Sequence, residues 1–121
     1  MIEENKDLLK FNAEGYDPTY IWHEAKNKAV KAVDEFVEKH GEPMYCGFAW
    51  VDVYVTRTNS KEAKLLESVG FKKSYRAKTM TMWNPADYNG QSMDCREVGA
   101  QAYADVLRAY GFRASMGSRA D

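Results

Sequence analysis

The sequence has few of the residues that most often carry catalysis, metal binding or covalent cross-links. Its 121 residues include two histidines, two cysteines and three prolines. His23 and His40 are not spaced as metal ligands on one helical turn, and Cys46 and Cys95 form no C-x-x-C motif. A G-x-S-x-G motif and a glycine-rich phosphate loop are also missing. We therefore expect a non-enzymatic protein with no catalytic residues, metal or cofactor, and with two buried, reduced thiols.

Long apolar segments are missing as well. The longest apolar run, residues 44–51, is far shorter than the ~20 residues that a membrane-spanning helix needs. The acidic N-terminus lacks the apolar stretch of a secretory signal. These absences predict a cytoplasmic protein that does not bind a membrane. The chain length fits a single domain, which we assign to residues 1–121, with residues 1–16 as an N-terminal arm or short helix.

Net charge is also small, at −1, but the charge is unevenly distributed. Residues 1–42 carry ten acidic and six basic residues, whereas residues 43–93 carry four acidic and seven basic residues. The positive charge is densest at Lys72, Lys73, Arg76 and Lys78. Lysines of this kind commonly blunt the edge of a β-sheet, and they are also the residue type that contacts nucleic-acid phosphates.

Hydrophobic periodicity and capping signals predict an α+β fold. Three amphipathic helices, the first beginning at the Asp17-Pro18 cap and ending before Gly41, alternate with three segments rich in alternating apolar residues. The expected result is a small three-stranded sheet packed by three helices, in the order α-β-α-β-α-β. The predicted ranges are helix 18–40, strand 44–56, helix 60–69, strand 74–83, helix 95–110 and strand 112–116.

The first strand is apolar on one face and mostly aromatic on the other, with a single acidic residue, Asp52. A carboxylate within a strand can act as an acid or base with a raised pKa. It can also pair with a cation on a neighbouring strand, and we favour such a pair with Arg76 or Lys78. Because both faces of this strand look covered and a small sheet has open edges, homo-oligomerisation is a further hypothesis.

The segment from Trp83 to Asp94 is dense in polar and aromatic side chains. It contains the turn dipeptides Asn-Pro and Asn-Gly, so we expect a loop. The loop enters the last helix at a D-x-x-E capping box with Asp94 as the N-cap, where the free N–H groups of the helix N-terminus favour an anion. In the alternative interpretation, these residues only bond their own backbone. The candidate binding residues are Trp83, Asn84, Tyr88, Asn89, Gln91, Ser92 and Asp94, with Arg119 from a C-terminal tail that either frays or lies beside the loop.

One longer pattern resembles small, functionally unassigned proteins of tailed bacteriophages. It comprises W-N-P at 83–85, N-G-Q-S-M-D at 89–94, E-V-G-A at 97–100, A-D-V-L at 104–107 and G-S-R-A-D at 117–121, together with G-F-A-W-V at 47–51. The resemblance implies a phage-encoded protein acting in the host cytoplasm. Our first hypothesis is therefore an accessory protein that binds a host or phage protein, for example to inhibit a host defence.

Two other functions compete with that hypothesis. In the first, a sheet face binds single-stranded nucleic acid: Phe48, Trp50, Tyr54 and Tyr75 stack bases. Phosphates would then contact Lys72, Lys73, Arg76 and Lys78. In the second, the chain is a small nucleotide-binding protein or hydrolase that uses Asp52 or Asp94 beside the last helix.

Overall fold

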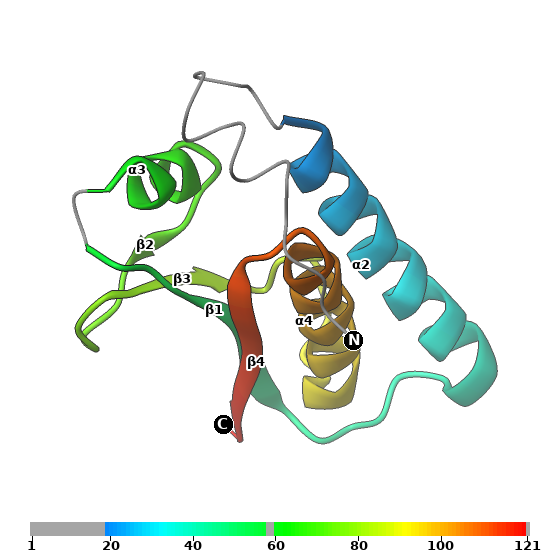
Figure 1. Ribbon diagram of the computed structural model, residues 1–121. Coiled ribbons are helices and arrows are strands. Elements are labelled where there is room, and N and C mark those ends of the chain that lie inside the picture. Colours follow the sequence, from blue (N-terminus) through cyan, green and yellow to red (C-terminus); the bar gives the residue numbers. More distant parts are fainter. Residues whose placement is uncertain (1–18, 58–59, 121) are drawn as a thin grey trace.

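The computed structural model describes residues 19–57 and 60–120 (Figure 1). The elements assigned there form the series helix-strand-helix-strand-strand-helix-strand. Their bounds are α2 (Thr19–His40), β1 (Gly47–Tyr54), α3 (Lys61–Ser68), β2 (Lys72–Lys73), β3 (Thr79–Trp83), α4 (Met93–Ala109) and β4 (Arg113–Ala120). Within these ranges no helix is long and apolar enough to cross a membrane.

The strands form one antiparallel sheet in the order β2-β3-β1-β4. The most apolar strand, β1, is therefore central and is hydrogen-bonded on both sides, to β3 and to β4. From β1 onward the chain follows the series β-α-β-β-α-β, in which each helix connects two strands that are not neighbours. This arrangement is the split β-α-β, or ferredoxin-like, topology.

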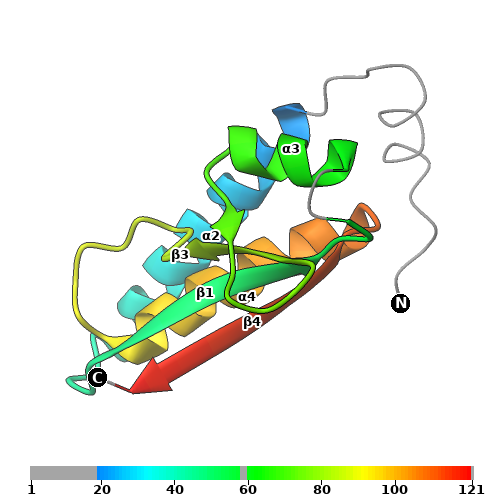
Figure 2. The ribbon, with the colours of Figure 1, turned by 90° about the vertical axis from the view of Figure 1, so that its left-hand side faces the viewer.

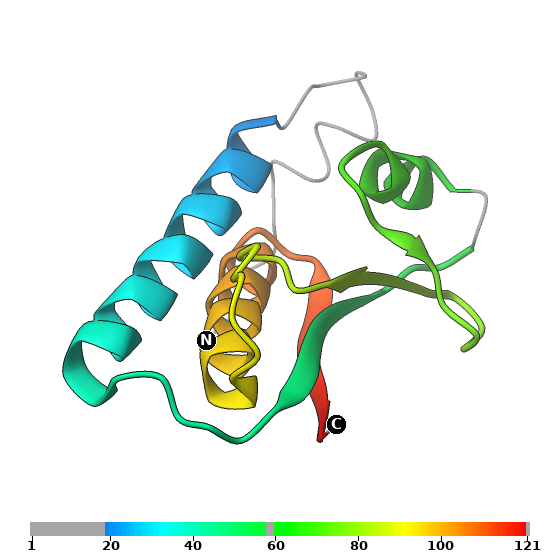
Figure 3. The same ribbon diagram turned by 180° about the vertical axis from the view of Figure 1, so that it is seen from behind.

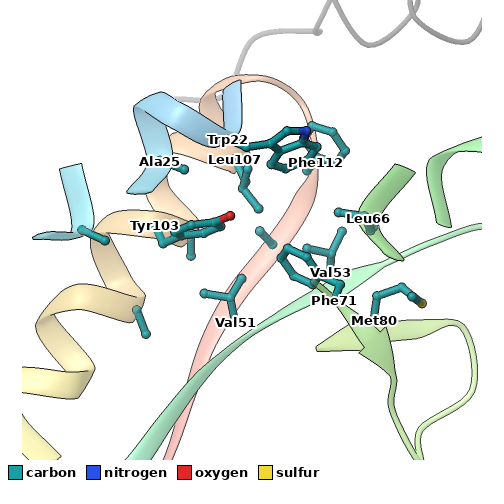
Figure 4. Close-up of a cluster of buried hydrophobic side chains, with 14 of the residues drawn as sticks. Trp22, Ala25, Val51, Val53, Leu66, Phe71, Met80, Tyr103, Leu107 and Phe112 are labelled. Atoms are coloured by element: carbon teal, nitrogen blue, oxygen red, sulfur yellow. The ribbon is translucent and has the colours of Figure 1, made fainter. Parts of the chain in front are cut away.

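The described helices lie on one face of the sheet. Helix α4 packs on β1 and β4, and α2 packs on the far side of α4 (Figures 1 and 3). Helix α3 lies near β3, where Leu66 points toward Val53 and Met80 (Figure 4). In Figure 2 the sheet is in front, with α2 and α4 behind it.

The hydrophobic core lies between the sheet and α4. Val51 and Val53 both point from β1 toward the helices and are fully buried in the core. Trp22 packs its ring 5.4 Å from that of Phe112, so α2 contributes to the same core. The core includes Ile21. Its other large members are Trp22, Val51, Val53, Leu66, Phe71, Met80, Tyr103, Leu107 and Phe112 (Figure 4).

The α+β class is as the sequence predicts, but the strand count and order are not. The predicted strand 74–83 is only half strand, because residues 74–78 form a turn with Lys78 at a left-handed φ of 57°. That turn joins β3 to the short strand β2, so the sheet has four strands in the described part of the chain and the order α-β-α-β-β-α-β. Alternation alone did not reveal the turn, because Lys78 lacks the glycine or asparagine usual at such a position.

Several predicted boundaries also change. Gly41 does end the first helix, with φ at +72° and its N–H donating to the Val37 carbonyl, whereas the predicted Asp17 cap lies outside the described residues. Cys46 is exposed rather than buried; Cys95 is buried as expected. The C-terminal tail is the second half of strand β4, which pairs with β1 along its whole length.

Candidate functional site

The face of the sheet opposite the helices is the most unusual surface of the described chain. We call this surface the open face. The register places Gly117, Trp50 and Trp83 in one row across β4, β1 and β3. The next row consists of Ser115, Asp52, Thr81 and Lys72. Two tryptophans and a carboxylate thus lie side by side on a surface that the described helices leave uncovered (Figure 2).

A groove of about 430 Å³ runs over the second of these rows. The tryptophans stand on one side of it, and the β2–β3 turn, which projects away from the helices, stands on the other (Figure 1). Tyr75, at the tip of that turn, is 93% exposed. The lining residues are Trp50, Asp52, Lys72, Lys73, Ser74, Tyr75, Arg76, Thr81, Trp83 and Arg119.

Trp50 is held flat on the sheet by its neighbours on either strand. A Cβ atom built on Gly117 would lie 2.6 Å from the indole Nε1, so the ring fills the space that any other residue at 117 would occupy. The indole N–H donates to the Asp52 carboxylate at 3.1 Å. The ring of Trp83, which is 53% exposed, lies 4.7 Å from that of Trp50 at an angle of 39°. Together the two rings form a fixed aromatic surface beside the groove.

Asp52 lies on the floor of the groove and is only 8% exposed. Its Oδ1 accepts the Thr81 hydroxyl at 2.6 Å, and its Oδ2 accepts the Trp50 indole N–H. The predicted ion pair with Arg76 or Lys78 is not formed; in the described residues the salt bridge found is Lys26 to Asp87. Hydroxyl and indole donors thus replace the expected cation, and both basic residues belong to the β2–β3 turn without an ion pair to Asp52.

Basic side chains surround the groove. Lys72 and Lys73 come from β2, Arg76 from the turn and Arg119 from β4, and all four are exposed. The hydroxyls of Tyr75 and Tyr54 lie beside the Arg76 guanidinium and raise its pKa, which keeps it charged. The fourth predicted basic residue, Lys78, is in the same turn but does not line the groove. The one acidic residue in the lining is Asp52.

Phe48 supports the site instead of forming part of the groove. Its ring meets that of Trp83 edge-on at 5.9 Å, and the guanidinium carbons of Arg96 and Arg119 lie 5.5 and 5.8 Å from its centroid. Phe48 is thus already covered by cations. Of the four aromatic residues expected to stack bases, Trp50 and Tyr75 line the groove, Phe48 lies behind Trp83, and Tyr54 lies one row further along β1.

The predicted loop site is divided by the structure. Trp83 and Arg119 both reach the groove, although the sequence prediction placed them with the loop. Asn84 folds back on the loop: its amide donates to the Tyr88 carbonyl, and its Oδ1 accepts the Tyr88 N–H. The Tyr88 hydroxyl donates to Glu42. These contacts show that part of the loop is an ordered connection.

The remaining loop residues differ in exposure. Ser92, which is 4% exposed, is the N-cap of α4 and accepts the Cys95 N–H, a role the sequence prediction gave to Asp94. Asp94 lies in the first turn and is half-buried. Asn89 and Gln91 are exposed. The segment that precedes β1 lies beside Gln91, because the Tyr45 carbonyl accepts the Met93 N–H and the Gly47 N–H donates to the Gln91 carbonyl. Met44 and Tyr45 of this segment are also exposed.

Sequence reasoning missed several parts of the groove, namely Gly117, Thr81, Ser74 and the position of Arg119. The signal available was period-two alternation, which identifies one face of β1 but not which neighbours share it. No group of three or more histidine, cysteine or carboxylate side chains in the described ranges is arranged to hold a metal ion.

Comparison with known proteins gave no match to a family model, to a curated protein or to a solved structure.

Proposed function

We propose that this protein binds single-stranded nucleic acid on the open face. The observation that supports the proposal is the combination, in one groove, of two preorganised tryptophans with four exposed basic residues and a single, hydrogen-bonded carboxylate. Aromatic rings supply stacking surfaces for bases, and basic side chains supply contacts for phosphates. Four-stranded sheets with exposed aromatics are the surface on which common RNA-recognition modules stack two or three bases.

The tryptophans are suited to stacking because they are fixed and partly exposed. Trp50 is held by Gly117 below and by its hydrogen bond to Asp52, so little side-chain entropy remains to be lost on binding. Trp83 presents about half of its surface to solvent. Large aromatic side chains this exposed, on a sheet face that no described helix covers, commonly mark a binding surface. A single strand is favoured over a duplex, because stacking requires unpaired bases.

The charges around the groove fit a polyanion. The net charge of the whole chain is −1, but the groove carries four cations and one anion. Local excess of positive charge, not the total, determines the potential that a phosphate meets at this surface. The basic residues lie on both sides of the tryptophans, Arg119 on β4 and the others on β2 and its turn. A strand crossing the sheet would therefore meet cations before and after the stacked bases.

The test is a fluorescence anisotropy titration of labelled, single-stranded mixed-sequence RNA and DNA with wild-type protein and with Trp83→Ala. Stacking contributes roughly 1–3 kcal/mol per base, so the variant should bind about 5- to 150-fold more weakly. Tyr45→Ala is the matched control, since Tyr45 is 60% exposed and lies outside the groove. Absence of binding by the wild type, or equal loss in both variants, would refute the proposal.

A protein partner is the second candidate function, and a different surface supports it. Exposed Met44 and Tyr45 precede β1, beside the exposed Gln91 of the β3–α4 loop. Asn89, two residues earlier in the same loop, is exposed as well. Aromatic and methionine side chains next to amides are typical of protein contact sites. Affinity capture with wild type and with Tyr45→Ala/Asn89→Ala tests it: a specific partner should be lost with this variant and retained with Trp83→Ala. Capture of no partner by the wild type, or loss of the partner with Trp83→Ala alone, would contradict this candidate.

A further inference from the structure

We propose that Asp52 makes the groove selective for guanine. This inference rests on the proposed function, and it concerns the acceptor positions of Asp52 that neither phosphate binding nor the support of Trp50 uses. A carboxylate repels phosphate, so Asp52 does not help to hold a nucleic-acid backbone. It nevertheless lies on the floor of the groove, 8% exposed, between the tryptophans and the basic turn.

The position of Asp52 is that of a group that reads the edge of a base. Trp50 and Trp83 occupy one row of the open face, and Asp52 and Thr81 occupy the next. A base stacked against the exposed Trp83 ring inside the groove would direct one edge to this second row. Thr81, in the same row, already donates its hydroxyl hydrogen to Asp52. The carboxylate of Asp52 is therefore the main group in this part of the groove that can accept a hydrogen bond from a base.

The carboxylate has acceptor capacity left for a ligand. An ionised carboxylate has about four lone-pair positions, two on each oxygen. Oδ1 accepts one hydrogen bond, from Thr81, and Oδ2 accepts one, from Trp50. These two donors fix the orientation of the carboxylate, and each oxygen retains one acceptor position. A ligand with two adjacent N–H donors would fill both of these acceptor positions, in the paired geometry that carboxylates favour.

Guanine is the base that carries such a pair of donors. Its Watson–Crick edge presents the N1–H and the N2 amino group side by side. Adenine and cytosine each present one amino group beside an acceptor nitrogen. Uracil and thymine present one N–H between two carbonyl oxygens, which a carboxylate repels. The expected order of affinity is therefore guanine first, adenine and cytosine next, and uracil last.

The experiment varies one base of the ligand while the protein stays wild type. Short oligouridines with a single central guanine, inosine, adenine, cytosine or uracil are titrated by fluorescence anisotropy. Guanine should exceed uracil by about tenfold or more. Inosine, which lacks the N2 amino group, should lose most of that preference. Equal affinity for guanine and inosine, or for guanine and uracil, would overturn the inference.

Asp52→Asn provides the protein side of the test. The substitution keeps the shape of the side chain but replaces one acceptor oxygen with a donor, so the preference for guanine over uracil should fall to about twofold or less. A uniform loss of affinity for all five oligonucleotides would show that Asp52 only positions Trp50, and would refute base selection. Binding without base preference refutes this inference alone, whereas no binding of any oligonucleotide refutes the proposed function.

Discussion

At the scale of single residues, Gly117 and Asp52 explain why a tryptophan can lie flat on an exposed sheet face. The ring of Trp50 occupies the position where a Cβ at 117 would stand, and its N–H has a fixed acceptor. Glycine is unfavourable within a strand by up to about 1 kcal/mol relative to alanine. A glycine at 117 therefore has a structural reason, because only a residue without a side chain leaves room for the Trp50 indole.

Gly117→Ala tests this account without changing a charge or an aromatic ring. The new methyl group would lie 2.7 Å from the Trp50 Cε2 atom, so the indole must tilt away from its position against β4. We expect binding of single-stranded oligonucleotide to weaken several-fold, while the free energy of unfolding changes by less than about 1 kcal/mol. Anisotropy and urea unfolding measure the two effects. Tyr45→Ala, outside the groove, is the control and should leave binding unchanged.

Tyr103 gives a prediction about pH that is independent of the open face. Burial in the core raises the pKa of its phenol to about 12, compared with about 10 in an unfolded chain. Between these pH values the unfolded state loses the proton and the folded state keeps it, so the free energy of unfolding falls as pH rises. The loss is roughly 2 kcal/mol over this range. In urea titrations, Tyr103→Phe should lose less stability than wild type between pH 10 and pH 12; parallel decreases would contradict the assignment.

At the scale of elements, the entry into α4 depends on Ser92. Ser92 is nearly buried, and its hydroxyl oxygen accepts the Cys95 N–H. An isolated bridge from Ser92 to Cys46 also connects this N-terminus to the start of β1. The N-cap of α4 is thus Ser92, although Asp94, two residues later, begins the D-x-x-E pattern from which the sequence predicts the cap.

Ser92→Ala should lower the free energy of unfolding by about 1 kcal/mol, the usual value of an N-cap side chain. Asp94→Asn is the comparison, and it should cost only a few tenths of a kcal/mol, because Asp94 acts through the helix dipole alone. Urea unfolding at neutral pH gives both values. A larger loss of stability for Asp94→Asn than for Ser92→Ala would show that Asp94, as the sequence pattern predicted, is the N-cap.

The elements also show what could be predicted from the sequence. Helical periodicity, Gly41 and the apolar alternation of β1 were sufficient to predict the α+β class. The sequence predicted both faces of the central strand to be covered, whereas the described helices cover only one. The division of residues 72–83 into two strands was not predictable, because Lys78 takes a left-handed φ that its residue type does not signal. Strand β4 beyond Met116 has no β-branched residue, and its pairing with β1 stabilises it instead.

The candidate site was predicted only in part, for a related reason. Trp83, Arg119, Trp50, Tyr75 and the basic residues were each recognised, but in two separate groups. The register between β1, β3 and β4 brings them into one groove. Because strand order arises from contacts between distant segments, alternation along one strand could not supply it.

At the scale of the whole molecule, positive charge is concentrated on the open face. The groove has four cations and one anion, whereas α2 carries four acidic and four basic residues and is neutral. Helix α2 lies beyond α4, on the side away from the open face (Figure 3). A polyanion should therefore approach the open face, and the near-zero total charge conceals this preference.

Salt dependence measures how many of these cations contact phosphates. For single strands the slope of log affinity against log salt is about −0.7 for each phosphate contact. Three or four contacts therefore predict a slope of roughly −2 to −3. Lys72→Glu/Arg76→Glu should reduce both affinity and slope, whereas Lys28→Glu/Lys31→Glu on α2, with the same change in charge, should alter neither strongly. Equal effects of the two pairs would indicate non-specific attraction.

The central claim, that the open face is the binding surface, is tested most directly by mapping NMR shifts of backbone and indole N–H groups during titration with a single-stranded oligonucleotide. We predict saturable shifts in β1, β3 and residues 72–78, and at the indole N–H groups of Trp50 and Trp83, with α2 unchanged. Shifts confined to α2 or to the β3–α4 loop, or no shifts at all, would contradict the account.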